Sequence, residues 1–281
     1  MSTPAPDLDP TASGPTANDP AAIDPVATID PIGAFRLDGR TAIVTGASSG
    51  LGDRFARVLH AAGADVVLAA RRVERLEALG KELDRSLVVR CDVADADDRE
   101  ALVAAAIDRF GSVDVLVNNA GIGIQGPAED EALEDFARVV DVNLTALFAL
   151  TQLVARPMLE RRRGSIINIA SVLGLVASAP IKQASYAASK GAVVNLTREL
   201  GAQWARKGVR VNAIAPGWFP SEMTPEMFEP GPSNDFMVRN TPMGRGGEVH
   251  ELDGALLFLA SDASSFVTGL TVPVDGGWTA R

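Results

Sequence analysis

From Arg40 onward, short runs of apolar residues alternate with longer segments in which apolar residues recur every three or four positions. Such short apolar runs are typical of strands buried on both faces, and the longer segments are typical of amphipathic helices. The pattern predicts strands at residues 41–45, 65–69, 87–90, 113–117, 165–169 and 209–214. The regular alternation therefore predicts an α/β protein with a mainly parallel sheet covered by helices on both faces.

The same pattern predicts the connecting helices, at residues 51–62, 73–83, 97–110, 133–158, 185–206 and from about 248 onward. Right-handed crossovers then place successive strands side by side, with all their carboxyl ends along one edge. Ligands of open α/β sheets bind at that edge. Asn143 lies inside the 133–158 helix, where asparagine is a poor helix former, so we expect a local distortion or a polar contact there.

Composition divides the chain into a tail and one domain. Residues 1–35 contain no lysine or arginine and are rich in Pro, Ala and Asp, which predicts a disordered tail rather than a secretory or mitochondrial targeting signal. Residues 36–281 are expected to form a single domain. Within it, residues from about 216 to 247 are rich in Trp, Phe, Met, Pro and Gly, which suits a substrate lid.

Charge and residue counts exclude several classes of function. A net charge of −10 and a pI of about 4.8 disfavour binding to nucleic acid or to anionic membranes. The single cysteine, Cys91, and the two distant histidines, His60 and His250, offer no disulfide, zinc cluster or histidine-based triad. No apolar run reaches the roughly 18 residues of a membrane-spanning helix. We therefore expect a cytoplasmic protein without a metal.

A glycine-rich turn follows the first strand. Gly46, Gly50 and Gly52 let the backbone turn sharply and expose its N–H groups just before a helix whose start carries partial positive charge. This arrangement suits a pyrophosphate, although the spacing differs from the usual dinucleotide fingerprint. The alternative is a glycine turn that holds no ligand.

Further polar residues follow later strands. The stretch 118–121, Asn-Asn-Ala-Gly, comes directly after the fourth strand, and Ser171 follows the fifth. The two amides can tie neighbouring strands together, and the small residues let a ligand approach the backbone. An ordinary polar turn is the alternative interpretation of this stretch.

Tyr186 and Lys190 lie four residues apart in the 185–206 helix, so they share one face of it. A phenol has a pKa near 10, and a nearby ammonium group stabilises its anion. The pair therefore predicts an acid–base site. A solvated helix face is the alternative for such a pair taken alone.

These motifs, in this order, resemble the single-domain form of the short-chain dehydrogenase/reductase family. The resemblance covers about residue 37 to the C-terminus and includes Pro216-Gly217 after the sixth strand and a last strand within 267–278. It implies a Rossmann-type, doubly wound sheet of seven strands. The stretch between Ser171 and Tyr186 is about two residues longer than is common in the family, so the substrate mouth there is expected to be reshaped.

The family resemblance implies an NAD(P)-dependent oxidoreductase that transfers a hydride between a nicotinamide cofactor and a secondary alcohol or ketone. Tyr186 would be the general acid and base, Lys190 would lower its pKa and hold the nicotinamide ribose, and Ser171 would bind the reacting oxygen. Asn143 would hold a water that links Lys190 to solvent. A non-catalytic dinucleotide-binding scaffold or sensor is the alternative, but it has no need of Ser171, Tyr186 and Lys190.

The resemblance also implies a set of cofactor-binding residues. They are Gly46, Ser48, Ser49, Gly50, Leu51, Gly52, Arg71, Arg72, Asp92, Val93, Asn119, Ala120, Gly121, Tyr186, Lys190, Pro216, Gly217 and Ser221.

The end of the second strand favours NADP over NAD. Folds that prefer NAD usually place an acid there, which binds the adenosine ribose and repels a 2′-phosphate. This chain has Ala70 followed by Arg71 and Arg72, whose guanidinium groups can bind a phosphate. Surface ion pairs with Glu74 and Glu77 are the alternative role for these arginines.

The expected partners are a small alcohol or ketone and further copies of the chain. The helices 133–158 and 185–206 carry more apolar residues than one sheet face should absorb, so we expect a homo-oligomer, by family resemblance a tetramer. The excess is seen in Leu144, Leu147, Phe148 and Leu150. Lys182 and Arg239 are candidates for binding an acidic substrate. Six lid residues could line an apolar pocket or pack on the domain: Trp218, Phe219, Met223, Met227, Phe228 and Phe236.

Overall fold

The computed structural model describes residues 30–177 and 179–280, so most of the predicted tail lies outside the described residues. Residues Ile32–Arg281 form one compact unit, which holds all of the elements below. A short 3-10 turn, Gly33–Phe35, precedes the first strand.

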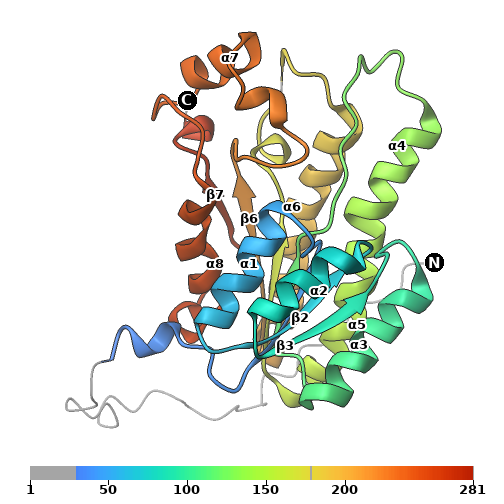
Figure 1. The fold of residues 1–281 in the computed structure, drawn as a ribbon, viewed down its shortest axis with the longest axis vertical. Coiled ribbons are helices and arrows are strands. Elements are labelled where there is room, and N and C mark those ends of the chain that lie inside the picture. Colours follow the sequence, from blue (N-terminus) through green and yellow to red (C-terminus); the bar gives the residue numbers. More distant parts are fainter. Residues whose placement is uncertain (1–29, 178, 281) are drawn as a thin grey trace, which may run out of the picture. The chain divides into compact units, whose positions relative to one another are not determined.

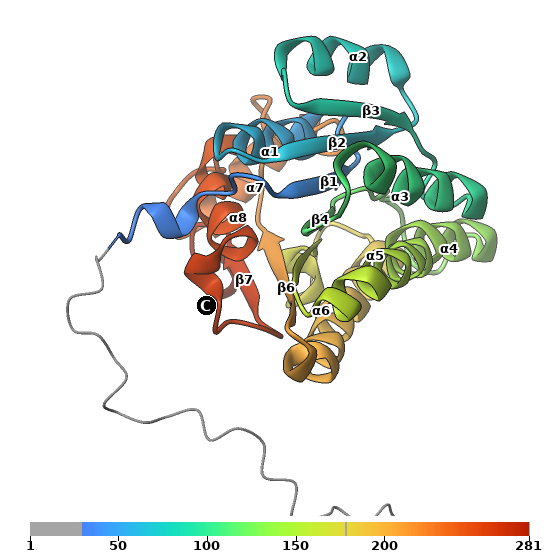
Figure 2. The ribbon, with the colours of Figure 1, turned by 90° about the horizontal axis from the view of Figure 1, so that it is seen from below.

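The described residues form a seven-stranded sheet in which every neighbouring pair is parallel (Figures 1 and 2). This confirms the predicted α/β class. The strands are β1 (Thr41–Thr45), β2 (Asp65–Ala70), β3 (Ser86–Arg90), β4 (Val115–Asn118), β5 (Gly164–Ile169), β6 (Val209–Pro216) and β7 (Thr271–Val274).

The strand order is β3-β2-β1-β4-β5-β6-β7, which corrects the expectation that all successive strands lie side by side. After β3 the chain crosses back over the sheet, and β4 pairs with β1 on the side away from β2. The winding therefore reverses between β1 and β4. The helices that follow these two strands pack on opposite faces of the sheet, and such a reversal is where open α/β sheets bind their ligands.

Helices cover both faces of the sheet, as Figure 2 shows from below. Their bounds are α1 (Gly50–Ala61), α2 (Val73–Glu82), α3 (Ala96–Phe110), α4 (Leu133–Val140), α5 (Leu147–Arg161), α6 (Ala184–Trp204), α7 (Pro232–Asn240) and α8 (Asp253–Ala260). Adjacent strand residues face opposite layers: Val44 packs with Phe55 of α1, whereas Ile43 packs with Leu102 of α3 and Val154 of α5. Each face of the sheet thus has its own apolar core.

A π-helical turn, Asp141–Ala146, joins α4 to α5, and Asn143 lies within it. The distortion expected around this asparagine is confirmed. The continuous helix Leu133–Arg161 has 29 residues and a most apolar window of mean hydropathy 1.3, so by length and composition alone it is able to cross a membrane. The search for unbroken apolar runs in the sequence predicts no such helix. In this fold, Leu150, Val154 and Met158 of the helix pack against the sheet as core residues.

Candidate active site

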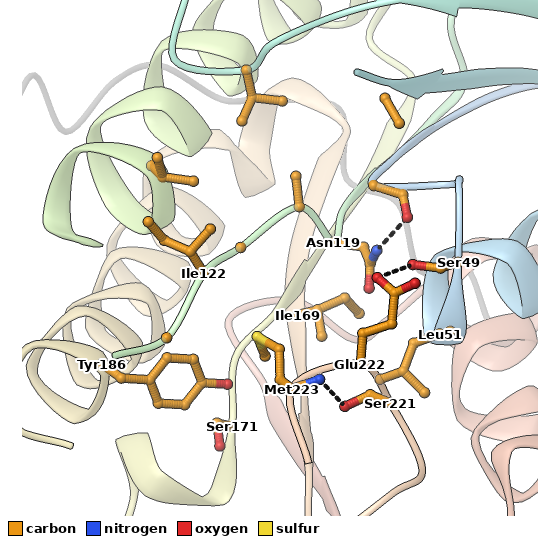
Figure 3. Close-up of a pocket in the computed structure, with 18 of the residues that line it drawn as sticks. Ser49, Leu51, Asn119, Ile122, Ile169, Ser171, Tyr186, Ser221, Glu222 and Met223 are labelled. Atoms are coloured by element: carbon orange, nitrogen blue, oxygen red, sulfur yellow. Dashed lines mark hydrogen bonds between the residues drawn. The ribbon is translucent and has the colours of Figure 1, made fainter. Parts of the chain in front are cut away.

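The carboxyl ends of the strands open into a cleft of about 810 Å³. Every residue predicted to bind the cofactor or to act in catalysis lines this cleft except Gly52 and Asn143. Figure 3 shows Tyr186 and Ser171 together at one end of the drawn site, and Ser49 and Glu222 at the other. Segments far apart in the sequence therefore meet in one elongated site.

Two of the three glycines in the turn after β1 lie where a side chain would not fit. Gly46 has a φ of +67°, and a Cβ atom there would lie 2.8 Å from the amide nitrogen of Asn119. A Cβ atom at Gly52 would lie 2.2 Å from the carbonyl oxygen of Gly46, which explains why Gly52 is beneath the cleft rather than in its lining. The absence of side chains brings the start of α1 directly to the cleft, as pyrophosphate binding requires.

The Thr45 hydroxyl joins this turn to the one after β4. Its oxygen accepts hydrogen bonds from the backbone N–H groups of Asn119, at 3.0 Å, and Ala120, at 3.1 Å. In return, the Asn119 side chain donates to the carbonyl oxygen of Thr45 at 2.9 Å. The two turns that flank the reversal in the sheet are thereby held together.

The amide of Asn118 extends these polar links across the sheet. Its nitrogen donates to Asn168 on β5 and to Thr151 on α5, each at 2.9 Å. Asn168 in turn donates to Thr197 on α6 at 2.9 Å. This confirms the expectation that the amides after β4 tie neighbouring strands together, and it corrects the ordinary-turn alternative.

Tyr186 and Ser171 lie side by side despite the longer stretch between them (Figure 3). Burial raises the pKa of Tyr186, and a hydrogen bond with the Ser171 hydroxyl lowers it by less. The Ser171 oxygen also accepts the backbone N–H of Leu173 at 3.1 Å, which fixes its orientation. The Tyr186 phenol is therefore protonated at neutral pH in this structure.

Lys190 is 4% exposed, and its ammonium donates to the carbonyl oxygen of Ile169 at 2.7 Å. It lies 5.6 Å from the centre of the Tyr186 ring. Burial lowers the pKa of Lys190 to about 8. Burial thus acts on both groups, and a lowering of the Tyr186 pKa by Lys190 stays a prediction.

Asn143 is fully buried, and its side chain ties the loop after β4 to α6. Its oxygen accepts the backbone N–H of Ile122 at 2.9 Å. Its nitrogen donates to the Ile122 carbonyl at 2.9 Å and to the Ser189 hydroxyl at 3.0 Å. These bonds use both amide hydrogens, so in this structure Asn143 positions the walls of the cleft around Lys190.

At the other end of the cleft, Arg72 holds the serines of the glycine turn. Its guanidinium donates to the Ser48 hydroxyl at 3.2 Å and to the Ser49 hydroxyl at 2.7 Å. Arg71 is 68% exposed, and its closest acid is Asp92 at 3.9 Å. In the part of the chain that the structure describes, Arg71 pairs with Asp92 and Arg72 with Glu222 rather than with Glu74 or Glu77, which corrects that alternative.

The remaining predicted cofactor residues also reach the cleft, from the ends of two strands. Asp92 and Val93 follow β3, Pro216 ends β6, and Gly217 and Ser221 begin the lid. A Cβ atom at Gly217 would lie 2.8 Å from the backbone of Asp275, so only glycine fits there.

Of the six apolar lid residues, Phe219 and Met223 line the cleft. The other four pack in a cluster with Trp278 beneath the lid, so they support the lid rather than the pocket surface. Some of the six lid residues therefore line the pocket, and the others pack on the domain.

The two cations considered for an acidic substrate do not line the cleft. Lys182 is exposed, and Arg239 donates to the backbone carbonyl of Asp235 at 3.1 Å in the last turn of α7. Both side chains are exposed outside the lining of the cleft.

Sequence reasoning missed several residues of the site. Glu222 lies in the cleft and accepts hydrogen bonds from Arg72 and from Arg75, which is on α2. Glu222 directly follows Ser221, and Arg75 lies one helical turn after Arg72. Both missed residues are thus close in sequence to residues that are predicted to bind the cofactor. Gly123 was also missed, and a Cβ atom there would be 3.3 Å from the Tyr186 ring.

In residues 30–177 and 179–280, no group of three His, Cys, Asp or Glu side chains is arranged to hold a metal. His60 lies 2.7 Å from Asp84, and His250 lies 3.3 Å from Glu248. Cys91 lines the cleft, but burial raises the pKa of its thiol to about 11, so it is not a thiolate at neutral pH.

The lining fits a dinucleotide. The glycine turn offers backbone donors at the start of α1, Arg71 and Arg72 offer positive charge at one end, and a proton donor lies at the other. These three features suit a pyrophosphate, a phosphorylated ribose and a reacting carbonyl in turn.

The shifted pKa of Lys190 predicts how stability depends on pH. Between about pH 8 and 10.5, the unfolded chain keeps a proton on Lys190 that the folded protein has lost, so the free energy of unfolding rises with pH. Wild type should gain on the order of 3 kcal/mol over Lys190→Met across this interval, given about 1.4 kcal/mol per pKa unit. Urea unfolding of both proteins across that range measures the difference. A constant difference would show that the lysine has its ordinary pKa.

Comparison with known proteins gives the same assignment. Residues 46–279 match a family model described as enoyl-(acyl carrier protein) reductase. The chain is 42% identical over 249 residues to gluconate 5-dehydrogenase of Gluconobacter oxydans (strain 621H), which covers 87% of this chain and 96% of the relative. It is 43% identical over 247 residues to galactitol 2-dehydrogenase (L-tagatose-forming) of Cereibacter sphaeroides. That alignment covers 87% of this chain and 97% of the relative.

A solved structure agrees over the same region. The crystal structure of a gluconate 5-dehydrogenase from Burkholderia cenocepacia J2315, in complex with NADP and tartrate, superposes with a TM-score of 0.84 at 40% identity. The superposition covers 88% of this chain and 98% of that one. The chain therefore belongs to the short-chain dehydrogenase/reductase family and is an NAD(P)-dependent oxidoreductase that acts on CH–OH groups.

Proposed function

We propose that this enzyme interconverts a ketone and a secondary alcohol with NADP(H) as its preferred cofactor. The observation that carries the proposal is the meeting of Ser171, Tyr186 and Lys190 at one end of a cleft that has Arg71 and Arg72 at the other. A scaffold that only binds a dinucleotide would not need the first three groups.

Tyr186 transfers the proton in this proposal. The cofactor supplies or accepts the hydride when bound. Tyr186 donates its phenolic proton to the carbonyl oxygen in reduction and takes it back in oxidation. Ser171, held by the Leu173 N–H, donates a hydrogen bond to the same oxygen as its negative charge develops.

Lys190 and Asn143 support this reaction. Lys190 holds the nicotinamide ribose hydroxyls and adds positive charge beside the phenol. Asn143 keeps the loop at Ile122 against α6, which leaves the lysine in place. Asn143 also holds a water, through which Lys190 exchanges protons with solvent.

The preference for NADP(H) rests on the end of β2. Ala70 brings no negative charge to the adenosine ribose, while Arg71 and Arg72 lie beside it and Ser48 offers a hydroxyl. The Burkholderia cenocepacia relative was crystallised with NADP. The names of the relatives make polyols and sugar acids the first substrates to assay, in both reaction directions.

We further propose a single catalytic domain over residues 36–281, with residues of about 216–247 as its lid and residues 1–35 as a tail. The lid supplies Phe219 and Met223 to the cleft, as a substrate cover should. A cytoplasmic location suits the single cysteine of the chain.

Tyr186→Phe should lose at least about a hundredfold in turnover, since a positioned acid or base contributes typically that much or more. Its affinity for NADPH should stay nearly unchanged, because only the hydroxyl is removed and the ring still packs. Absorbance at 340 nm measures turnover, and calorimetric titration measures the affinity. Normal turnover in this variant would exclude Tyr186 as the proton donor.

Arg71→Ala should weaken NADPH binding about tenfold, because a charge-assisted contact to a phosphate contributes roughly 1.5–3 kcal/mol. NADH binding should hardly change. Arg90→Ala is the matched control, since Arg90 is an exposed arginine on the next strand that pairs with Asp98. If wild type binds NADH more tightly than NADPH, or if Arg71→Ala binds NADPH as wild type does, the preference argued from Arg71 is wrong.

A homo-oligomer, by family resemblance a tetramer, is expected to form through α4, α5 and α6. Leu147 and Leu150 are already buried within one chain, so they drop out of the predicted interface. Leu133, 80% exposed, and Phe136, 37% exposed, remain on α4. Light scattering at micromolar protein should give the mass of four chains. A single-chain mass would refute the oligomer.

A further inference from the structure

A carboxylate from the lid lies among the positive groups at the adenosine end of the cleft. The oxygens of Glu222 are 3.0 Å from a nitrogen of Arg72 and 2.6 Å from a nitrogen of Arg75, and they accept the Ser49 hydroxyl at 3.2 Å. Figure 3 shows this carboxylate turned toward Ser49. The lid is thus bound to the wall that carries the proposed NADP(H) determinants.

Two of the three groups that hold Glu222, Arg72 and Ser49, are residues expected to bind the cofactor. Arg72, Ser48 and Ser49 were predicted to bind the cofactor, and Arg72 also donates to both serines. Two guanidinium groups and a hydroxyl form a typical anion site. A carboxylate and a 2′-phosphate present the same kind of oxygen acceptors to such a site.

Glu222 is firmly ionised in this setting. Hydrogen bonds from Arg72 and Arg75 lower the pKa of Glu222 to about 2. Its negative charge is therefore present at neutral pH. A second anion that approaches Arg72 has to compete with that charge.

We propose that Glu222 is a specificity-determining residue that occupies the site of the NADP(H) 2′-phosphate. The phosphate displaces the carboxylate from Arg72 and Arg75, and the lid is then released from this wall of the cleft. NAD(H) has no such phosphate and leaves the contact in place. Glu222 therefore narrows the preference for NADP(H) that Arg71 and Arg72 create.

The position of the lid supports this competition. Ser221, the preceding residue, approaches the glycine turn so closely that a Cβ atom on Gly50 would lie 3.9 Å from its side chain. The segment also folds on itself, since the Thr224 hydroxyl donates to the Phe219 carbonyl at 2.9 Å. Glu222 is thus presented to the arginines by a short, internally bonded stretch.

The inference rests on the proposed use of NADP(H) and is tested with Glu222→Gln, which removes the charge and keeps the shape. Glu226→Gln is the matched control, because Glu226 is on the same lid but accepts from Gln125, at 3.2 Å, rather than from an arginine. Calorimetry measures the affinity of each protein for NADPH and NADH. Adenosine 2′,5′-bisphosphate and 5′-AMP serve as probes of the adenosine end alone.

Glu222→Gln should bind NADPH and adenosine 2′,5′-bisphosphate about tenfold more tightly than wild type. Its affinity for NADH and 5′-AMP should stay within about twofold. Glu226→Gln should match wild type with all four ligands. This pattern would separate the loss of one competing charge from a general change in lid charge.

Two results would overturn the inference. Unchanged or weaker NADPH binding in Glu222→Gln would mean that the carboxylate and the phosphate do not share a site. Weaker NADH binding alone would mean that Glu222 holds the ribose hydroxyls instead. Failure of the proposed function looks different, since wild type would then bind NADPH no better than NADH.

Discussion

The Thr45 hydroxyl is the contact on which the geometry of the site depends. It accepts two backbone N–H groups from the turn after β4 and donates to the Val117 carbonyl, so all its hydrogen-bonding capacity is used between β1 and β4. Those strands flank the point where the sheet reverses its winding. Because each buried N–H left without an acceptor costs about 1–3 kcal/mol, this one side chain holds the glycine turn and the Asn119 turn at a fixed separation.

Buried amides carry the same constraint to the proton-transfer end. Asn118 and Asn168 connect β4 and β5 to α6 through Thr197, and Asn143 connects the loop at Ile122 to α6 as well. The helix that holds Tyr186 and Lys190 is therefore anchored to the sheet by polar bonds as well as by apolar packing. A polar network that is fully satisfied specifies one arrangement, since any shift would leave buried groups unpaired.

The sequence predicts what lies within one element or directly after it. The glycine turn follows β1, and Tyr186 and Lys190 share one helix, so spacing singles these residues out and the family resemblance assigns their roles. Contacts between distant segments have no local signature. Arg72 and Glu222 are 150 positions apart, and only the fold brings the lid to α2. The placement of β4 beside β1 was missed for the same reason, because strand pairing depends on the whole topology.

The pKa values at the site show where spacing arguments reach their limit. Helical spacing correctly places an ammonium near the phenol, and Coulomb attraction would then favour the phenolate. Burial acts on the same two groups with the opposite sign, since it raises the pKa of Tyr186 and lowers that of Lys190 to about 8. At neutral pH the pair is thus a neutral phenol beside an ammonium, which is the form that gives a proton to a carbonyl oxygen. Alcohol oxidation uses the phenolate, the form that the ammonium of Lys190 favours and that burial disfavours.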